Sequence, residues 1–95
     1  SKVADFALNW MPDGYQLLSQ QLPVMTNNGK MLASWLLTDG LHQISVFVQP
    51  GAGVPVQAYR DGATTILVQP KQQVDVTVIG PLEVELARRL ADSVQ

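Results

Sequence analysis

His42 decides whether the chain could carry out acid–base or nucleophilic chemistry, because it is the only histidine and there is no cysteine. Ser-His-Asp catalysis would have to use this ring, and a metal site normally needs further His or Cys ligands. His42 follows an Asp-Gly pair between two apolar runs, which predicts a histidine at a strand end, on the core face and partly covered by the sheet. A hydrolase that uses His42 is one hypothesis, and a structural histidine is the other.

The acidic residues have structural explanations. Three of them precede a glycine, as is typical of turns: Asp13, Asp39 and Asp61. Asp75 interrupts a valine-rich segment, where we expect it on the outward face as a charge that opposes aggregation. Glu83 and Glu85 lie near the start of a predicted helix, where they complement its dipole. We therefore expect no enzymatic activity, no metal and no cofactor.

Composition narrows the choice of partner. The chain has 95 residues, a formal net charge of -2 and only six basic residues. This charge gives no electrostatic reason to expect nucleic acid as a partner. No apolar run approaches the roughly 20 residues of a membrane span. Because the chain begins with Ser1 rather than Met, we expect it to be a piece of a longer protein.

A β-hairpin over residues 31–49 organises the predicted fold. Asp39-Gly40 suits a two-residue type I′ turn, which would pair Trp35 with Ile44 and Leu32 with Phe47. The predicted core face of this hairpin consists of Met31, Ala33, Trp35, Leu37, His42, Ile44, Val46 and Val48.

Other strands are predicted on both sides of this hairpin, over residues 15–22, 63–69 and 74–79. The first has a weak pattern that is typical of an edge strand. The segments 23–29 and 54–62 are predicted to be a loop and an irregular connection.

The register of the last two strands depends on the length of the loop between them. A two-residue loop at Pro70-Lys71 would place Leu67 opposite Val74. A connection of three or five residues would place Val68 there instead. We favour the longer connection because it gathers the β-branched residues on one face.

A C-terminal helix follows Gly80-Pro81. Its apolar stripe recurs every four residues over about 13 residues: Leu82, Leu86, Leu90 and Val94. The predicted fold class is α+β, with an antiparallel sheet of four to six strands, mostly in meander order, and this helix packed on one face.

A helix can cover only one face of so small a sheet. If it covers the Trp35 face, then Leu32, Leu36 and Phe47 are left for water, a neighbouring domain or a partner. The alternative is that residues 1–9 cover them. Two apolar residues of the 23–29 loop either tuck under the sheet or stay exposed for a partner. The candidate partner-binding residues are Leu32, Leu36, Phe47, Val24 and Met25.

Several of these segments, in the same order, resemble the C-terminal domain of the RseB/MucB family. The resemblance spans residues 10–94 and rests on the following motifs: Trp10-x-Pro12-x-Gly14-Tyr15; Asp39-Gly40-Leu41 followed by Ile44-Ser45-Val46-Phe47-Val48; and Val76-Thr77-Val78-Ile79-Gly80 followed by Ala87-Arg88-Arg89-Leu90-Ala91-Asp92-Ser93-Val94. Ile44 departs from the pattern, since the family has an aromatic residue there.

The resemblance implies a periplasmic negative regulator of the envelope-stress sigma factor. Such a protein has a larger N-terminal domain, similar to lipoprotein carriers, whose implied ligand is lipid or lipopolysaccharide. The C-terminal domain helps to hold the periplasmic segment of a membrane anti-sigma factor and shields it from regulated proteolysis. We expect residues 1–9 to be a linker and 10–95 to be this domain. The alternative is a lipid-binding or purely structural domain that supports the lipid-sensing one.

Overall fold

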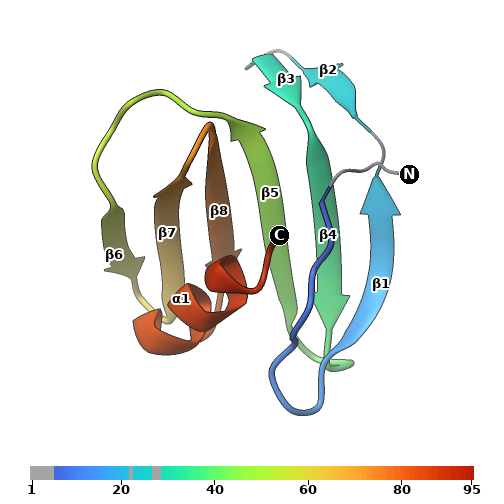
Figure 1. The fold of residues 1–95 in the computed structure, drawn as a ribbon. Coiled ribbons are helices and arrows are strands. Elements are labelled where there is room, and N and C mark those ends of the chain that lie inside the picture. Colours follow the sequence, from blue (N-terminus) through green and yellow to red (C-terminus); the bar gives the residue numbers. More distant parts are fainter. Residues whose placement is uncertain (1–5, 22, 27–28) are drawn as a thin grey trace.

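In the described part of the chain, one antiparallel sheet carries a C-terminal helix on one face (Figure 1). The computed structural model describes residues 6–21, 23–26 and 29–95. Six strands form the main sheet: β1 (Gln16–Gln21), β4 (Ala33–Thr38), β5 (Gln43–Pro50), β6 (Gln57–Asp61), β7 (Thr64–Lys71) and β8 (Val74–Gly80). A separate ribbon consists of β2 (Val24–Thr26) and β3 (Gly29–Met31), and the helix is α1 (Val84–Asp92). The predicted α+β class is confirmed.

The strands follow the order β1-β4-β5-β8-β7-β6. This order departs from a simple meander at one connection. Residues 51–56 carry the chain from β5 to the far edge of the sheet, and β6, β7 and β8 then return toward the centre (Figure 1). The last strand, β8, therefore pairs with β5. Within the described part of the chain, no helix is both long enough and apolar enough to cross a membrane.

The β4–β5 hairpin has a four-residue loop, so the predicted two-residue turn is wrong. Leu37 pairs with Ile44, and Trp35 pairs with Val46. A type I′ turn needs positive φ at both central residues, and here only Gly40 has it, at 97°. The Asp39 carboxylate instead accepts hydrogen bonds from the backbone N–H groups of Leu41 (2.8 Å) and His42 (2.6 Å). Because the register moved by two residues, six of the eight predicted core-face residues are buried, whereas Met31 is half-buried and His42 is exposed in the loop.

The β7–β8 hairpin closes through a two-residue loop at Gln72-Gln73, and Lys71 pairs with Val74. The longer connection that the sequence favoured is therefore wrong. Leu67 lies opposite Val78 and is fully buried. Ile66 and Val68 consequently point to the opposite face. The strand period alone allows either arrangement, and burial of Leu67 beneath α1 decides between them.

Two segments predicted to lack strands contain them. Segment 54–62 includes β6, which pairs with β7. Every residue of β6 is exposed, so it has no alternating apolar pattern for sequence reasoning to detect. Segment 23–29 contributes to the β2–β3 ribbon, in which Val24 pairs with Met31. Asn27 and Asn28, part of the predicted turn, lie outside the described residues.

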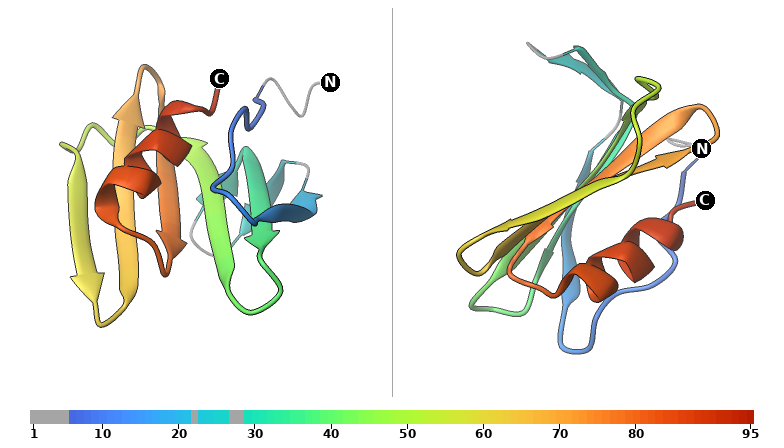
Figure 2. Two further views of the ribbon diagram at one scale, coloured as in Figure 1. Left: turned by 90° about the horizontal axis from the view of Figure 1, so that it is seen from below. Right: turned by 90° about the vertical axis from the view of Figure 1, so that its left-hand side faces the viewer.

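The core lies between the sheet and α1. Its buried members are Ala33, Trp35, Leu37, Ile44, Val46, Val48, Leu67, Val76, Val78, Leu82, Ala87, Leu90, Ala91 and Val94. The helix has nine residues rather than about 13, and Leu86 from the predicted stripe is 40% exposed. Residues 6–10 run over β4 on the same side as α1 (Figures 1 and 2). They are fixed there by a pair of backbone hydrogen bonds between Ala7 and Gln95, at 2.9 and 3.0 Å.

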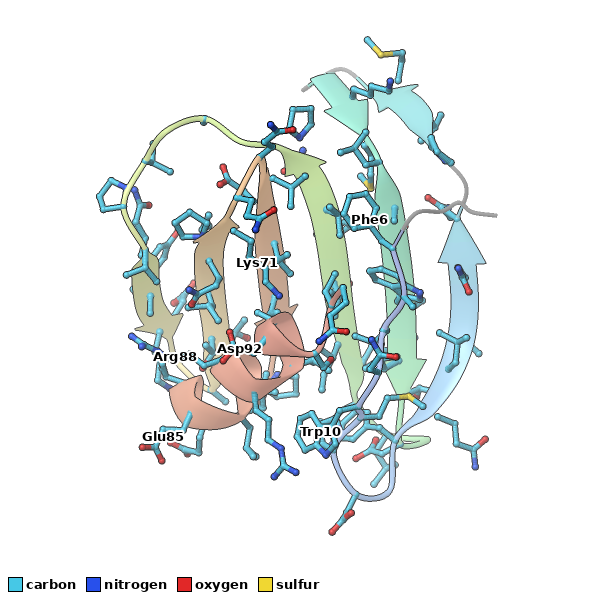
Figure 3. All side chains as sticks on the ribbon, viewed as in Figure 1. Phe6, Trp10, Lys71, Glu85, Arg88 and Asp92 are labelled. Atoms are coloured by element: carbon cyan, nitrogen blue, oxygen red, sulfur yellow. The ribbon has the colours of Figure 1, made fainter. Side chains whose placement is uncertain are left out.

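Lys71 joins the sheet to the end of α1. Its Nζ donates hydrogen bonds to the backbone carbonyl oxygens of Ala91 (3.1 Å), Asp92 (3.3 Å) and Val94 (2.6 Å). These carbonyls lie at the negative end of the helix dipole, where a cation is favourable. The charged side chains of Glu85, Arg88 and Asp92 project away from the sheet (Figure 3).

Candidate interaction surface

Among the residues that the structure describes, no helix lies on one face of the sheet. Both α1 and residues 6–15 lie on the other side (Figure 2). The helix-free side carries apolar side chains from five of the six strands, which we call the open face: Leu36, Phe47, Tyr59, Ile66, Val68 and Ile79. Strand pairing places them side by side, since Tyr59 lies opposite Ile66 and Ile66 lies opposite Ile79.

The open face is partly exposed. Five of its six members are half-buried by their neighbours in the sheet, and Tyr59 is 57% exposed. Between them lie small hydroxyl residues, Ser45 and Thr77, which pair with Ile79 and Phe47. Asp61 and the buried Asp75 lie at the margins of this face. A mildly apolar surface with charge only at its margins is typical of a site that contacts another protein.

The five residues predicted to bind a partner are distributed over three places. Leu36 and Phe47 belong to the open face. Leu32 does not pair with Phe47 as predicted, because Ser34 takes that position, and Leu32 packs against the core. Val24 (46% exposed) and Met25 (72% exposed) lie on the β2–β3 ribbon and do not tuck under the sheet.

Four open-face residues were missed from the sequence: Tyr59, Ile66, Val68 and Ile79. Ile66 and Val68 were assigned to the core face by the incorrect register of β7 and β8. Tyr59 belongs to a strand that was predicted to be irregular. The alternative with a two-residue loop assigned the faces of β7 correctly. It placed Leu67 on the same face as the alternating valines of β8, so that Ile66 and Val68 point to the opposite face.

A groove of about 750 Å³ lies on the opposite side of the domain, between the turn near Trp10 and α1. The Arg89 guanidinium carbon lies 4.3 Å from the centroid of the Trp10 ring, within cation–π range. Across the groove, Arg60 forms an ion pair with Glu83 at 3.3 Å. Figure 3 places Trp10 beside the helix on this side. The arrangement clamps residues 10–15 and β6 to α1.

The candidate chemical residue, His42, lies outside the core, contrary to the prediction. Its side chain is 55% exposed in the β4–β5 loop, and Nδ1 is 3.2 Å from Asp39 Oδ2. The backbone N–H groups of His42 and Leu41 lower the pKa of Asp39 to about 2. The carboxylate therefore stays charged and organises the loop. Within residues 6–21, 23–26 and 29–95, no three His, Asp or Glu side chains are close enough to hold a metal ion.

Asp75 points to the helix-free side, as expected, but it does not act as an exposed charge. It is only 7% exposed, and its Oδ2 accepts a hydrogen bond from the backbone N–H of Ala52 at 3.1 Å. Asp75 thus holds the connection between β5 and β6 in place, rather than acting as a surface charge that opposes aggregation.

Comparison with known proteins agrees with this geometry. The profile of the MucB/RseB C-terminal domain matches residues 1–95. Sigma-E factor regulatory protein RseB of Salmonella typhimurium is 29% identical over 89 residues, covering 92% of this chain and 28% of RseB. RseB of Escherichia coli is 27% identical over 88 residues, covering 90% of this chain and 28% of RseB. The chain therefore spans less than a third of these relatives.

Solved structures agree as well. MucB in complex with MucA(peri) superposes with a TM-score of 0.81 at 26% identity, over 95% of this chain and 35% of that one. The MucA/MucB complex of Pseudomonas aeruginosa gives the same TM-score and identity, over 95% of this chain and 34% of that one. The motifs, the fold and the profile match over the whole chain agree, and the chain belongs to the MucB/RseB C-terminal domain family.

Proposed function

We propose that this domain is a non-enzymatic regulatory binding module that helps to hold the periplasmic segment of a membrane anti-sigma factor. The observation that carries the proposal is the match over 95% of the chain to MucB in its complex with MucA(peri). By holding that segment, the protein shields it from regulated proteolysis and keeps the envelope-stress response off. The corresponding location is the periplasm.

The open face supports this role physically. Its apolar side chains lie in register across the strands, so a partner could bury them together, at about 25 cal/mol per Å² of apolar area. None of the six open-face side chains carries a formal charge, which lowers the desolvation cost of contact. The exposed Val24 and Met25 on the ribbon would extend the same contact.

We also propose how the domain connects to the rest of its protein. Residues 1–9 act as the link, and residues 10–95 act as the domain. The hydrogen bonds of Ala7 with Gln95 and of Asn9 with Ser93 tie the end of this link to the C-terminal tail. The described part of the link, residues 6–9, therefore lies on the side of α1, away from the open face.

A ligand-binding role is the second candidate, favoured by one cavity. A cavity of about 510 Å³ lies at the C-terminal end of α1, and its lining includes Phe6, Val74 and Val94. Its volume falls within the range of small-molecule sites. Thermal shift with lipid A and with phospholipid micelles tests this role, and an increase in Tm that Val74→Asp abolishes would support it.

The main proposal is tested with the full-length protein and the purified periplasmic part of the MucA homologue from the same organism. Titration calorimetry should give a saturable one-to-one interaction. Adding a protease that cleaves the anti-sigma segment should then cut the free segment faster than the bound one. A full-length protein that is folded and shows no heat of binding would contradict the proposal.

A further inference from the structure

The two edges of the sheet differ in their protection. Edge strands expose unpaired backbone groups, and proteins usually protect them with charges, proline or a cover. The edge strand β6 carries Arg60 and Asp61 and follows Pro55. The other edge strand, β1, has the sequence QLLSQQ, without charge or proline, and all six residues are exposed. Among the described residues, β1 pairs only with β4, so its outer side is open.

An apolar pocket lies beside this unprotected edge. It has a volume of about 200 Å³ and lies between residues 6–11, which cross over β4, and β1 itself. Leu17 and Met11 form two of its walls and are 46% and 38% exposed, and Trp35 lies at its base. Its size suits one large apolar side chain. A strand that paired with β1 would point every second side chain to the face of the sheet on which this pocket lies, and the one next to Leu17 would lie beside it.

We propose that β1 is a strand-addition site, at which an extended segment of the partner pairs with Gln16–Gln21 and inserts one apolar side chain beside Leu17. The proposal rests on the proposed function, because it specifies the conformation in which the anti-sigma segment binds. Backbone hydrogen bonds along β1 hold the added strand, and the pocket determines which side chain of that strand fits beside Leu17. The uncharged glutamines and serine of β1 place no charge against the added strand.

An extended peptide fits this edge better than a second copy of the chain. Leu18 is an additional residue that forms a bulge between Leu17 and Ser19, and a bulge increases the local twist. A flexible segment can follow that twist, whereas two rigid copies would each bring the same bulge to the contact. Two paired six-residue strands, each about 20 Å long, would also bury far less than the roughly 800 Å² per partner of a stable dimer.

Amide hydrogen exchange on the full-length protein tests the strand addition. The probe is the periplasmic part of the MucA homologue, added at saturation. Exchange at amides of Gln16–Gln21 that face outward should slow by at least tenfold on binding, while exchange in α1, on the side of the sheet away from the open face, should not change. If the segment binds and the β1 amides exchange as in the free protein, the strand addition is wrong and the proposed function stands. If nothing binds, both are wrong.

A pair of matched leucine variants tests the pocket. Leu17→Ala removes a pocket wall, whereas Leu86→Ala removes a leucine of similar exposure (40%) that lines the groove beside Trp10 instead. Leu17→Ala should weaken binding of the same probe by about tenfold, and Leu86→Ala by less than twofold. An equal loss in the two variants, or a larger loss for Leu86→Ala, would overturn the assignment. Circular dichroism checks that both variants remain folded.

Discussion

Ile66 lies directly opposite Ile79 on the face of the sheet that α1 leaves uncovered. This pairing follows from the two-residue loop at Gln72-Gln73, and it turns the neighbouring Leu67 inward to Val78. The same strand register therefore determines both faces of the sheet. One face packs against the helix to form the core, and the other presents apolar side chains to a partner.

The register can be tested by two adjacent truncations. Leu67→Ala should lower the free energy of unfolding by about 2–5 kcal/mol, because Leu67 is fully buried and its loss leaves a cavity. Val68→Ala on the half-buried open face should cost less than about 1.5 kcal/mol. Urea denaturation measures both values. Equal costs, or a larger cost at Val68, would mean that the faces of β7 are reversed.

Gly80 gives a test of packing between β8 and β5. A Cβ atom at Gly80 would lie 2.8 Å from Ile44 Cγ1, closer than real Cβ contacts come, and 3.2 Å from Ile44 Cα, which is also a tight contact. Gly80→Ala should therefore destabilise the domain by about 1–3 kcal/mol through overpacking. In the same denaturation experiment, Gly80→Ala should cost less in an Ile44→Ala background, which lacks the Cγ1 atom, than in the parent protein. A stable Gly80→Ala variant would contradict the close approach of β8 and β5.

Lys71 should contribute to stability through the end of α1. Lys71→Met keeps most of the side-chain length and removes the hydrogen bonds to Ala91, Asp92 and Val94. Hydrogen bonds from a charged donor typically contribute about 1.5–3 kcal/mol, so a loss near the lower end of that range is expected at this half-buried position. Amide exchange in the last turn of α1 should accelerate. Lys30→Met on the exposed ribbon is the control and should change neither quantity.

The loop between β4 and β5 should show a distinctive acid titration. The pKa of Asp39 is lowered to about 2 by backbone N–H donors, so the charged form is favoured in the folded state. The stabilisation by Asp39 is therefore present above the unfolded pKa, near 4, and is lost as the pH falls toward 2. Carbon-detected NMR of the Asp39 carboxyl group should give a midpoint near 2. A midpoint near 4 would show that the Leu41 and His42 donors are not engaged.

The core side of the β4–β5 hairpin could be predicted from the sequence, although its loop could not. Trp35 and Leu37 lie two positions apart and so share one face of their strand, as do Ile44 and Val46. A shift of the strand pairing by two residues leaves these faces unchanged. The loop depends on the Asp39 side chain, which competes with the type I′ turn by accepting backbone hydrogen bonds itself.

The open face was harder to predict, because β7 is apolar at successive positions. Ile66, Leu67 and Val68 fit a strand in either orientation, and only contact with α1 selects Leu67 for the core. The strand that carries Tyr59 has no buried residue at all, so its place in the sheet depends on its pairing with β7. Leu36 and Phe47 were predicted correctly to lie on this face, because they belong to the β4–β5 hairpin, whose two faces were assigned correctly.

The most direct test of the account is calorimetric titration of the full-length protein with the periplasmic part of its MucA homologue, comparing two surface variants. Ile66→Ser/Ile79→Ser changes the open face, and Leu41→Ser changes an apolar residue that is 88% exposed elsewhere. We expect the open-face variant to lose at least tenfold in affinity, with Leu41→Ser within twofold of the parent. If the folded Ile66→Ser/Ile79→Ser protein binds as tightly as the parent, the open face is not where the partner is held.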